Sequence, residues 1–260
     1  MAADARRTVR MPIERRYVAR LLISIGLSIG VALLCPQLVG GVPSSLVLLV
    51  KWVFVPTGSM VPVATVIYTC FGWLLFCYLF SDFFEEGISH SAVHVLPRSR
   101  SRRTWFAHRM ACLLVYVALY AVLVDGALVW LGGAQAEGAA VALFAGTVLL
   151  DVLTLTVIML VTLFVATLLN PVVACPVVFG GHLLALCAFA SADPDVATCA
   201  AWLLPSAQGV YALHEEAVLA SGFGQPVAMV GMGYSCGYLA IGLLALLAAL
   251  WARFAKRDVL

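Results

Sequence analysis

AAVALFAGTVLLDVLTLTVIMLVTLFVATLLNPVVACPVVFGGHLLALCAFAS, residues 139–191, contains a single charged side chain in an almost uninterrupted apolar run. A helix needs roughly 20 apolar residues to cross the hydrocarbon core of a bilayer, so this run is long enough for two crossings. The pair Asn170-Pro171 divides the run, because proline ends a helix and disfavours helical geometry in the residue before it. The sequence therefore predicts two membrane-spanning helices, 139–169 and 172–191, joined by a tight turn.

The rest of the chain has the same character. Of its 260 residues, 63% are hydrophobic and 11% are charged, and the mean hydropathy is +1.06. Soluble domains carry about 25% charged residues and fewer apolar ones, so this composition predicts an all-α integral membrane protein. No internal repeat divides residues 1–260, which we expect to form a single transmembrane domain. Four further apolar runs bring the expected number of transmembrane helices to six: about 18–35, 59–82, 111–131 and 227–252.

Lysine and arginine are confined almost entirely to three segments. Six lie in the N-terminal tail up to Arg20, five lie between residues 83 and 110, and three follow Ala252; only Lys51 lies elsewhere. The cytoplasmic segments of membrane proteins carry an excess of these residues. Six spans with both termini in the cytoplasm put all three basic segments on that side. Residues 83–110 are therefore predicted to be cytoplasmic, and the loop 192–226 is predicted to be extracellular.

The sequence motifs typical of several kinds of chemistry are absent from this chain. The eight cysteines form no CxxC pair, so they give no sign of a disulfide framework or a metal site. Neither lysine, Lys51 nor Lys256, precedes Ser or Thr, so the phosphate-binding loop GxxxxGK[ST] is absent. The zinc-protease motif HExxH is absent as well. We therefore expect this chain to contain no catalytic residue and to bind no metal or cofactor itself.

Two acidic residues lie inside the predicted spans. Asp151 is near the middle of the fourth span, and Asp125 is in the outer half of the third. Ionisable side chains at such depths are costly and usually face a polar interior. Both residues are therefore candidates for a substrate or proton path. The alternative is that each is a buried, hydrogen-bonded acid with a structural role.

The first and last spans each contain two glycines four residues apart. These are Gly26 and Gly30 in the first span, and Gly233 and Gly237 in the last. This spacing lets the backbones of two helices approach closely. The glycines therefore predict helix packing, either within this subunit or against a second copy or a related subunit.

The densest cluster of charge lies between the second and third spans. It reads SDFFEEGISHSAVHVLPRSRSRRTWFAHRM, residues 81–110, and holds three acids and five arginines. Residues 83–97 are predicted to form a helix that Pro97 ends. One face of this helix is apolar, at spacings of three and four residues: Phe84, Ile88, Ala92 and Val95. A second face carries Glu86, His90 and His94.

This segment has three interpretations. The row of one glutamate and two histidines has a spacing that suits a metal ion, although no fourth ligand is evident. The arginines suit contacts with anionic lipid headgroups. A cytoplasmic helix that docks into the groove of a partner protein accounts for both the acidic and the basic half of the segment. The arginines expected at the membrane surface are Arg15, Arg16, Arg98, Arg100, Arg102 and Arg103.

The layout of the chain resembles a known family. A basic amphipathic helix, residues 11–20, precedes six spans, and a short acidic helix followed by a basic run joins the second span to the third. Proteins of this family often carry E…G…L…P-x-S-R at that junction. The pattern maps onto Glu85 or Glu86, Gly87, Leu96, Pro97, Ser99 and Arg100. In layout the whole chain thus resembles the permease subunit of type-2 ABC transporters, and the specific motifs are few and short.

The resemblance implies an ATP-driven exporter in a bacterial cell membrane. Residues 83–97 would be the coupling helix, seated in a separate ATPase subunit that uses ATP and Mg²⁺, and residues 11–20 would be an elbow helix along the inner membrane surface. A second permease subunit, identical or related, would complete the transporter. The substrate would be hydrophobic, lipid or peptide-like, and no nucleic-acid partner is expected. The residues expected to contact the ATPase are Phe84, Glu85, Glu86, Ile88, His90, Val95 and Leu96.

The predicted extracellular loop fits the same resemblance. It is expected to contain a helix after Pro205. Members of the family carry short re-entrant helices between their last two spans, at the outer gate. The resemblance then implies that His214, Glu215 and Glu216 lie at the exit. The alternative is an ordinary interfacial helix with a solvated acidic face.

Two other functions are open at this point. The chain could be a membrane scaffold that recruits a cytoplasmic partner without transporting anything; such a scaffold should not raise nucleotide turnover. It could also be a transporter that works without ATP. Paired polar groups inside the spans would favour a transporter that works without ATP, and such groups are sparse in the sequence.

Overall fold

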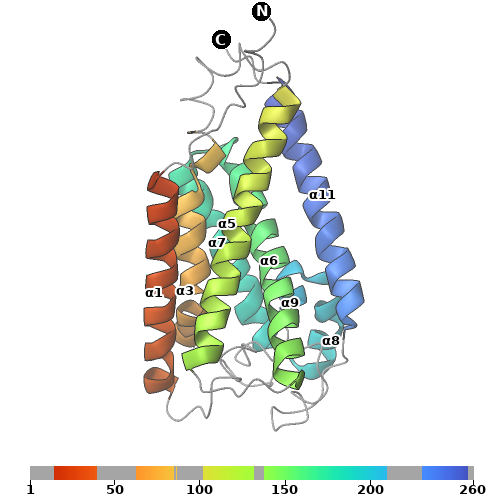
Figure 1. The fold of residues 1–260 in the computed structure, drawn as a ribbon. Helices are drawn as coiled ribbons and strands as arrows, with labels where there is room; N and C mark the ends of the chain where they lie inside the picture. Colours follow the sequence, from red (N-terminus) through yellow and green to blue (C-terminus); the bar gives the residue numbers. More distant parts are fainter. Residues whose placement is uncertain are drawn as a thin grey trace, which may run out of the picture.

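The structure is a computed structural model that describes residues 15–39, 63–84, 86, 102–131, 138–209 and 230–256. The described residues form a bundle of helices without strands (Figure 1). Its helices are α1 Arg15–Val39, α3 Val63–Phe80, α5 Arg102–Leu131, α6 Gly138–Ala166, α7 Pro171–Ala190, α8 Pro194–Leu203, α9 Pro205–Gln208 and α11 Met232–Lys256.

Five of these helices are long and apolar enough to cross a membrane: α1, α5, α6, α7 and α11. The helix α3 has 18 residues and no charged side chain, and at about 1.5 Å per residue it rises about 27 Å. The prediction of an all-helical structure with several apolar helices long enough to cross a membrane is therefore confirmed for the described residues.

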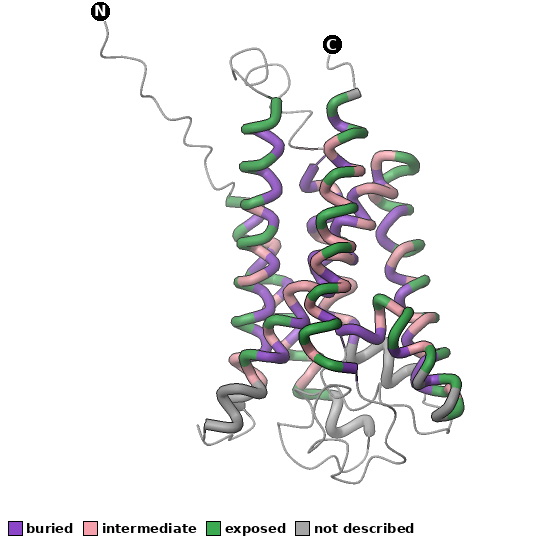
Figure 2. Tube along the Cα trace, turned by 90° about the vertical axis from the view of Figure 1, so that its right-hand side faces the viewer, coloured by how far each residue is buried: buried purple, intermediate pink, exposed green. Residues whose placement is uncertain are grey.

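The bundle is organised around α6. This helix contacts α5, α7 and α11, and it is the most buried of the five long apolar helices. The helix α1 packs on α3 and α5. The least buried of the five are α1 and α11, which lie at the periphery. Figure 2 shows buried and exposed positions alternating along the helices, as expected when each helix covers one face and presents another to lipid.

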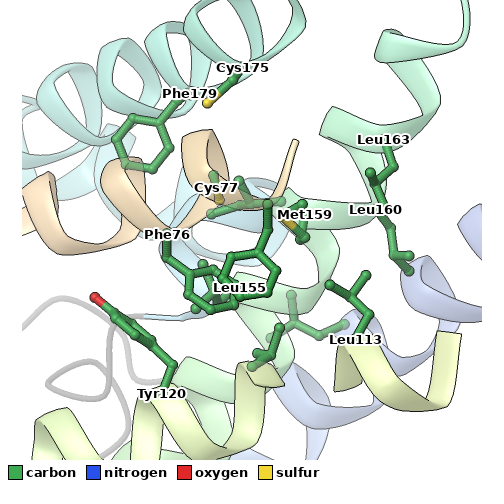
Figure 3. Close-up of a cluster of buried hydrophobic side chains, with 14 of the residues drawn as sticks. Phe76, Cys77, Leu113, Tyr120, Leu155, Met159, Leu160, Leu163, Cys175 and Phe179 are labelled. Atoms are coloured by element: carbon green, nitrogen blue, oxygen red, sulfur yellow. The ribbon is translucent and has the colours of Figure 1, made fainter. Parts of the chain in front are cut away.

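A core of aromatic and aliphatic side chains fills the space where α3, α5 and α6 meet (Figure 3). Phe76 and Cys77 of α3 are fully buried, and the Phe76 ring lies 4.8 Å from the ring of Tyr120 on α5. Leu155 and Met159 of α6 close this core and are also fully buried. Dense packing here fixes the three helices relative to one another.

The turn predicted at Asn170-Pro171 is present. The Asn170 side chain caps α7 by accepting a hydrogen bond from the backbone N–H of Val172 at 2.9 Å, and Pro171 is the first helical residue. Proline is well suited to that position because its missing N–H has no intrahelical partner there. The preceding helix ends at Ala166 rather than at the predicted residue 169.

Two predicted boundaries near the starts of α1 and α5 are wrong. The helix α5 begins at Arg102, nine residues before the predicted start of the third span, because Trp105 and Phe106 are buried against other helices. Residues 15–20 of the predicted elbow helix are the first part of α1 and continue into it without a break. Residues 11–14 of that predicted helix lie outside the described residues.

Candidate functional site

The candidate site lies at one end of the bundle, where α1 and α5 begin and α3 and α11 end. We call it the basic end, because described arginines of three helices lie there: Arg15, Arg16, Arg20, Arg102, Arg103, Arg109 and Arg253. The predicted coupling helix, 83–97, leaves the bundle at this end. Of that segment, the structure describes residues 83, 84 and 86. The described chain resumes at residue 102.

The start of this segment is tied to α1 by a two-point ion pair. Arg20 donates from Nη1 to Oδ1 of Asp82 at 2.6 Å and from Nη2 to Oδ2 at 3.0 Å. Nη1 also donates to the Leu79 carbonyl at 2.9 Å. Paired guanidinium–carboxylate bonds are stronger and geometrically stricter than single ones. The first helix therefore holds the end of α3 in a defined orientation.

Glu86 is also held by α1. The Tyr17 hydroxyl donates to Oε2 of Glu86 at 2.8 Å, and the Arg16 guanidinium forms an ion pair with the other carboxylate oxygen. Tyr17 is 1% exposed. The sequence assigned Glu86 to a contact with a partner, but the described contacts of its carboxylate are made inside the chain.

Arg109 fixes the same turn from α5. Its side chain is 7% exposed and donates to the Phe83 carbonyl from Nε at 3.2 Å and from Nη2 at 2.7 Å. The guanidinium also lies 3.9 Å from the centre of the Phe83 ring and 5.4 Å from that of Tyr17. Such cation–π contacts contribute about 0.5–2 kcal/mol. We call the whole set the basic clamp: Arg16, Tyr17, Arg20, Asp82, Phe83, Glu86 and Arg109.

A second cluster ties the segment to α11. Phe84 is 2% exposed, and its ring lies 5.7–6.0 Å from the rings of three aromatic residues: Trp105, Phe106 and Phe254. Phe254 also stacks on Trp105 at 5.3 Å, and Trp251 meets Phe106 at 5.4 Å. We call these five residues the aromatic cap. Phe84, which the sequence assigned to the partner, therefore points into the bundle.

At the opposite end, α8 and α9 fold back into the bundle (Figure 1). His182 Nδ1 lies 2.9 Å from the Ser206 hydroxyl of α9, and Gly209 touches Thr154 so closely that a Cβ on Gly209 would lie 2.8 Å from its Cγ2. Thr154 and His182 are close to the middle of the apolar segments of α6 and α7. The short helix α9 thus lies at the depth of the helix centres. The sequence predicted a helix after Pro205 but not α8 before it.

The contacts of α9 explain how polar groups are accommodated at this depth. The Gln208 amide is 1% exposed; it donates to the Ala201 carbonyl and accepts a hydrogen bond from the Ser235 hydroxyl. Buried polar groups are tolerated when they are hydrogen-bonded. Irregular backbone at membrane depth is tolerated only when it is buried in protein or lines a water-filled cavity.

Two serines lie in surroundings that resemble those of a hydrolase nucleophile. Ser206 and His182 have the spacing of a nucleophile and its base, and Ser235 lies in a GxSxG sequence, Gly233 to Gly237. A GxSxG nucleophile needs a sharp turn between a strand and a helix, whereas this one lies in the first turns of α11 and its hydroxyl is bonded to Gln208. Both serines are explained by the polar contacts that attach α9 to its neighbours.

The two acids of the predicted path are buried. Asp125 is 5% and Asp151 is 3% exposed, and both carboxyl groups lie in the neighbourhood of Tyr120. That hydroxyl is hydrogen-bonded to Ser28 of α1 at 2.8 Å. Polar groups that are scattered along the sequence are therefore gathered in the interior between α1, α5 and α6. The sequence alone had suggested that they were sparse.

The remaining predicted residues divide into two groups. Arg15, Arg102 and Arg103 are exposed at the basic end, and Arg103 lies 6.0 Å from the ring of Trp251. The others lie outside the described residues: Glu85, Ile88, His90, His94, Val95, Leu96, Arg98, Arg100, His214, Glu215 and Glu216. Within the described part of the chain, no three His, Cys, Asp or Glu side chains are grouped as metal ligands would be.

Comparison with known proteins gives no match: no family model, no curated protein and no solved structure resembles the chain significantly. The functional argument therefore rests on the residues and contacts described above.

Proposed function

We propose that this chain is the membrane-spanning permease subunit of an ATP-driven ABC transporter, with six transmembrane helices and with the basic end and both termini in the cytoplasm. A separate ATPase subunit would use ATP and Mg²⁺, and this chain would convert its motion into a path across the membrane. Arginine-rich ends of membrane helices favour the cytoplasmic side. The resemblance in layout described above supports the same assignment.

The double attachment of the cytoplasmic segment carries this proposal. The start of the segment is bound to α1 and α5 through the basic clamp and to α5 and α11 through the aromatic cap. A load applied to residues 83–97 by a partner would therefore reach α1, α3, α5 and α11 together. A loop that merely connects two spans requires no such attachment.

The periphery of the bundle supports a second permease subunit. Within the described residues, no atom outside the local helix backbone lies within 4 Å of a Cβ placed on Gly26, Gly30, Gly233 or Gly237. These glycines therefore do not serve packing inside the described part of the subunit. Because glycines four residues apart allow close helix contact, α1 and α11 offer faces for an identical or related subunit. The resemblance in layout implies export of a hydrophobic, lipid or peptide-like substrate.

Co-purification tests this function. The natural chain, solubilised from its native membranes in mild detergent, should bring down an ATPase subunit. Glu85→Arg should abolish the association, while Glu215→Arg, a charge reversal in the predicted extracellular loop, should leave it intact. Glu86→Arg is a poor choice for this purpose, because it would also break the contacts with Arg16 and Tyr17. Absence of an ATPase with the natural chain under several mild detergents would contradict the proposal.

A transporter that works without ATP is the second candidate, and one observation favours it. Asp125, Asp151 and Tyr120 are gathered in the interior of the bundle, and intramembrane carboxylates often mark ion or proton paths. In proteoliposomes without any ATPase, an ion gradient should then drive solute uptake by the natural chain but not by Asp151→Asn. A scaffold would give neither ATP turnover nor uptake.

A further inference from the structure

The helix α11 makes specific side-chain contacts at both of its ends, and between them one of its faces packs on α6. It runs over 25 residues, Met232–Lys256, which corresponds to about 37 Å of helix. It is the least buried of the helices that are long enough to cross a membrane. Its main neighbours in the described structure are α6 and α9. Because a helix is stiff along its axis, a displacement at one end of α11 is carried to the other end, with repacking confined to the face that meets α6.

At the basic end, α11 is joined to the start of the cytoplasmic segment. Phe254 is 1% exposed and contacts four aromatic rings. These rings belong to Phe84, Trp105, Phe106 and Trp251, at 5.3–5.8 Å. Aromatic pairs contribute about 0.5–1.5 kcal/mol each beyond the area that they bury. A displacement of Phe84 or Trp105 therefore acts directly on the last turns of α11.

At the opposite end, α11 holds α8 and α9 by three side chains one turn or less apart. Tyr234 donates to the Trp202 carbonyl at 3.0 Å, and Tyr238 donates to the Leu203 carbonyl at 2.9 Å. Ser235 donates to the Gln208 side chain, which is buried beside it. The two tyrosines bind the last carbonyls of α8, which have no partner inside that helix. These bonds depend on the position of α11 along its axis.

We propose that α11 is a mechanical link between the two ends of the bundle: its position couples the aromatic cap to the docking of α8 and α9. In one arrangement the cap is packed and α8 and α9 are docked; in the other both contacts are loosened together. The coupling is a property of this chain and does not depend on whether the cytoplasmic partner is an ATPase. By linkage it must act equally in both directions.

Hydrogen exchange of the full chain in lipid nanodiscs tests the link. Phe254→Ala should accelerate exchange of the backbone amides of residues 197–208 by about fivefold or more, the lower end of typical coupling between sites. Leu244→Ala is the matched control, because this leucine lies on the same helix and is 65% exposed; it should change that exchange by less than about twofold. If Phe254→Ala does not fold, Phe254→Leu takes its place.

The reverse experiment changes Gln208 of α9, at the end of α11 opposite to the aromatic cap. Gln208→Ala should accelerate exchange in residues 102–110 by a similar factor, whereas Cys199→Ser, at an exposed position of α8, should not. The proposal is overturned if Phe254→Ala affects only residues 102–110, or if exchange rises equally in residues 70–77, which would indicate general destabilisation. Neither measurement involves nucleotide or an ATPase, so their outcome is independent of the co-purification test.

Discussion

At the scale of single residues, Gly72 allows a contact between helices that no other residue would permit. Gly72 of α3 faces the hydrogen bond between Ser28 and Tyr120, and a Cβ there would lie 2.5 Å from the Tyr120 hydroxyl oxygen and 2.8 Å from the Ser28 Cβ. Contacts this short force neighbouring groups to move. Three helices can therefore meet around a buried hydroxyl pair only because the side chain at residue 72 is a hydrogen atom.

Gly72→Ala should accordingly lower the stability of the bundle by about 1–3 kcal/mol, the usual cost of overpacking a core. Thermal unfolding in detergent, followed by far-UV circular dichroism, measures the effect. Gly181→Ala is the matched control, since a Cβ at Gly181 meets no described atom within 4 Å; its unfolding temperature should be unchanged or slightly higher. Equal unfolding temperatures for the two variants would disprove the close approach.

Arg109 provides a second test at this scale. Arg109→Ala removes both donors to the Phe83 carbonyl and the cation–π contact, and hydrogen bonds to a charged group contribute about 1.5–3 kcal/mol. We expect a destabilisation of at least about 1.5 kcal/mol, with faster hydrogen exchange in residues 80–84. Arg102→Ala, at an exposed position of the same helix, should have no measurable effect. An effect of the same size in both variants would mean that charge alone matters.

At the scale of elements, the position of α9 depends on its contact with α6. Gly209→Ala should push a methyl group against the Thr154 side chain and cost about 1–3 kcal/mol. The hydroxyl of Thr154 has no hydrogen-bond partner among the described residues, so Thr154→Ala should be tolerated and should relieve part of the clash. In a double-mutant cycle measured by thermal unfolding, we expect a coupling energy of about 1 kcal/mol. Strict additivity would show that the two residues do not touch.

The elements were predictable where local chemistry decides them. Apolar length alone indicated the spanning helices, and Asn170-Pro171 indicated the turn between α6 and α7. The early start of α5 was not predictable, because it depends on the burial of Trp105 and Phe106 against Phe254, far away in the sequence. The same holds for α8, which the hydrogen bonds from Tyr234 and Tyr238 hold in place.

The basic clamp was missed although the sequence held a signal for it. Antiparallel first and second spans put Arg20 and Asp82 at the same level, and Arg109 begins the next span at that end. Opposite charges at one membrane level suggest a pair. The role of Tyr17 and the inward orientation of Phe84 required tertiary structure, because periodicity alone does not show which neighbour covers a helix face.

At the scale of the whole molecule, the outer faces of α1 and α11 are the surfaces on which we expect a second subunit to pack. If a second subunit packs there, Gly30→Leu and Gly237→Leu should each reduce association between subunits at least severalfold, as read by chemical cross-linking in native membranes. Neither should lower the unfolding temperature, because a Cβ at these positions meets no described atom of the same chain. Gly181→Leu on α7 is the control. Loss of subunit stability without loss of association would assign these glycines to internal packing.

The central claim is that a cytoplasmic ATPase acts on this chain through the segment between α3 and α5. The most direct measurement is the rate of ATP hydrolysis by material purified through this chain, comparing the natural sequence with Glu85→Arg and Glu215→Arg. We expect hydrolysis with the natural chain and with Glu215→Arg, and a fall to background with Glu85→Arg. Hydrolysis that is absent from all three preparations, or unchanged by Glu85→Arg, would contradict this claim.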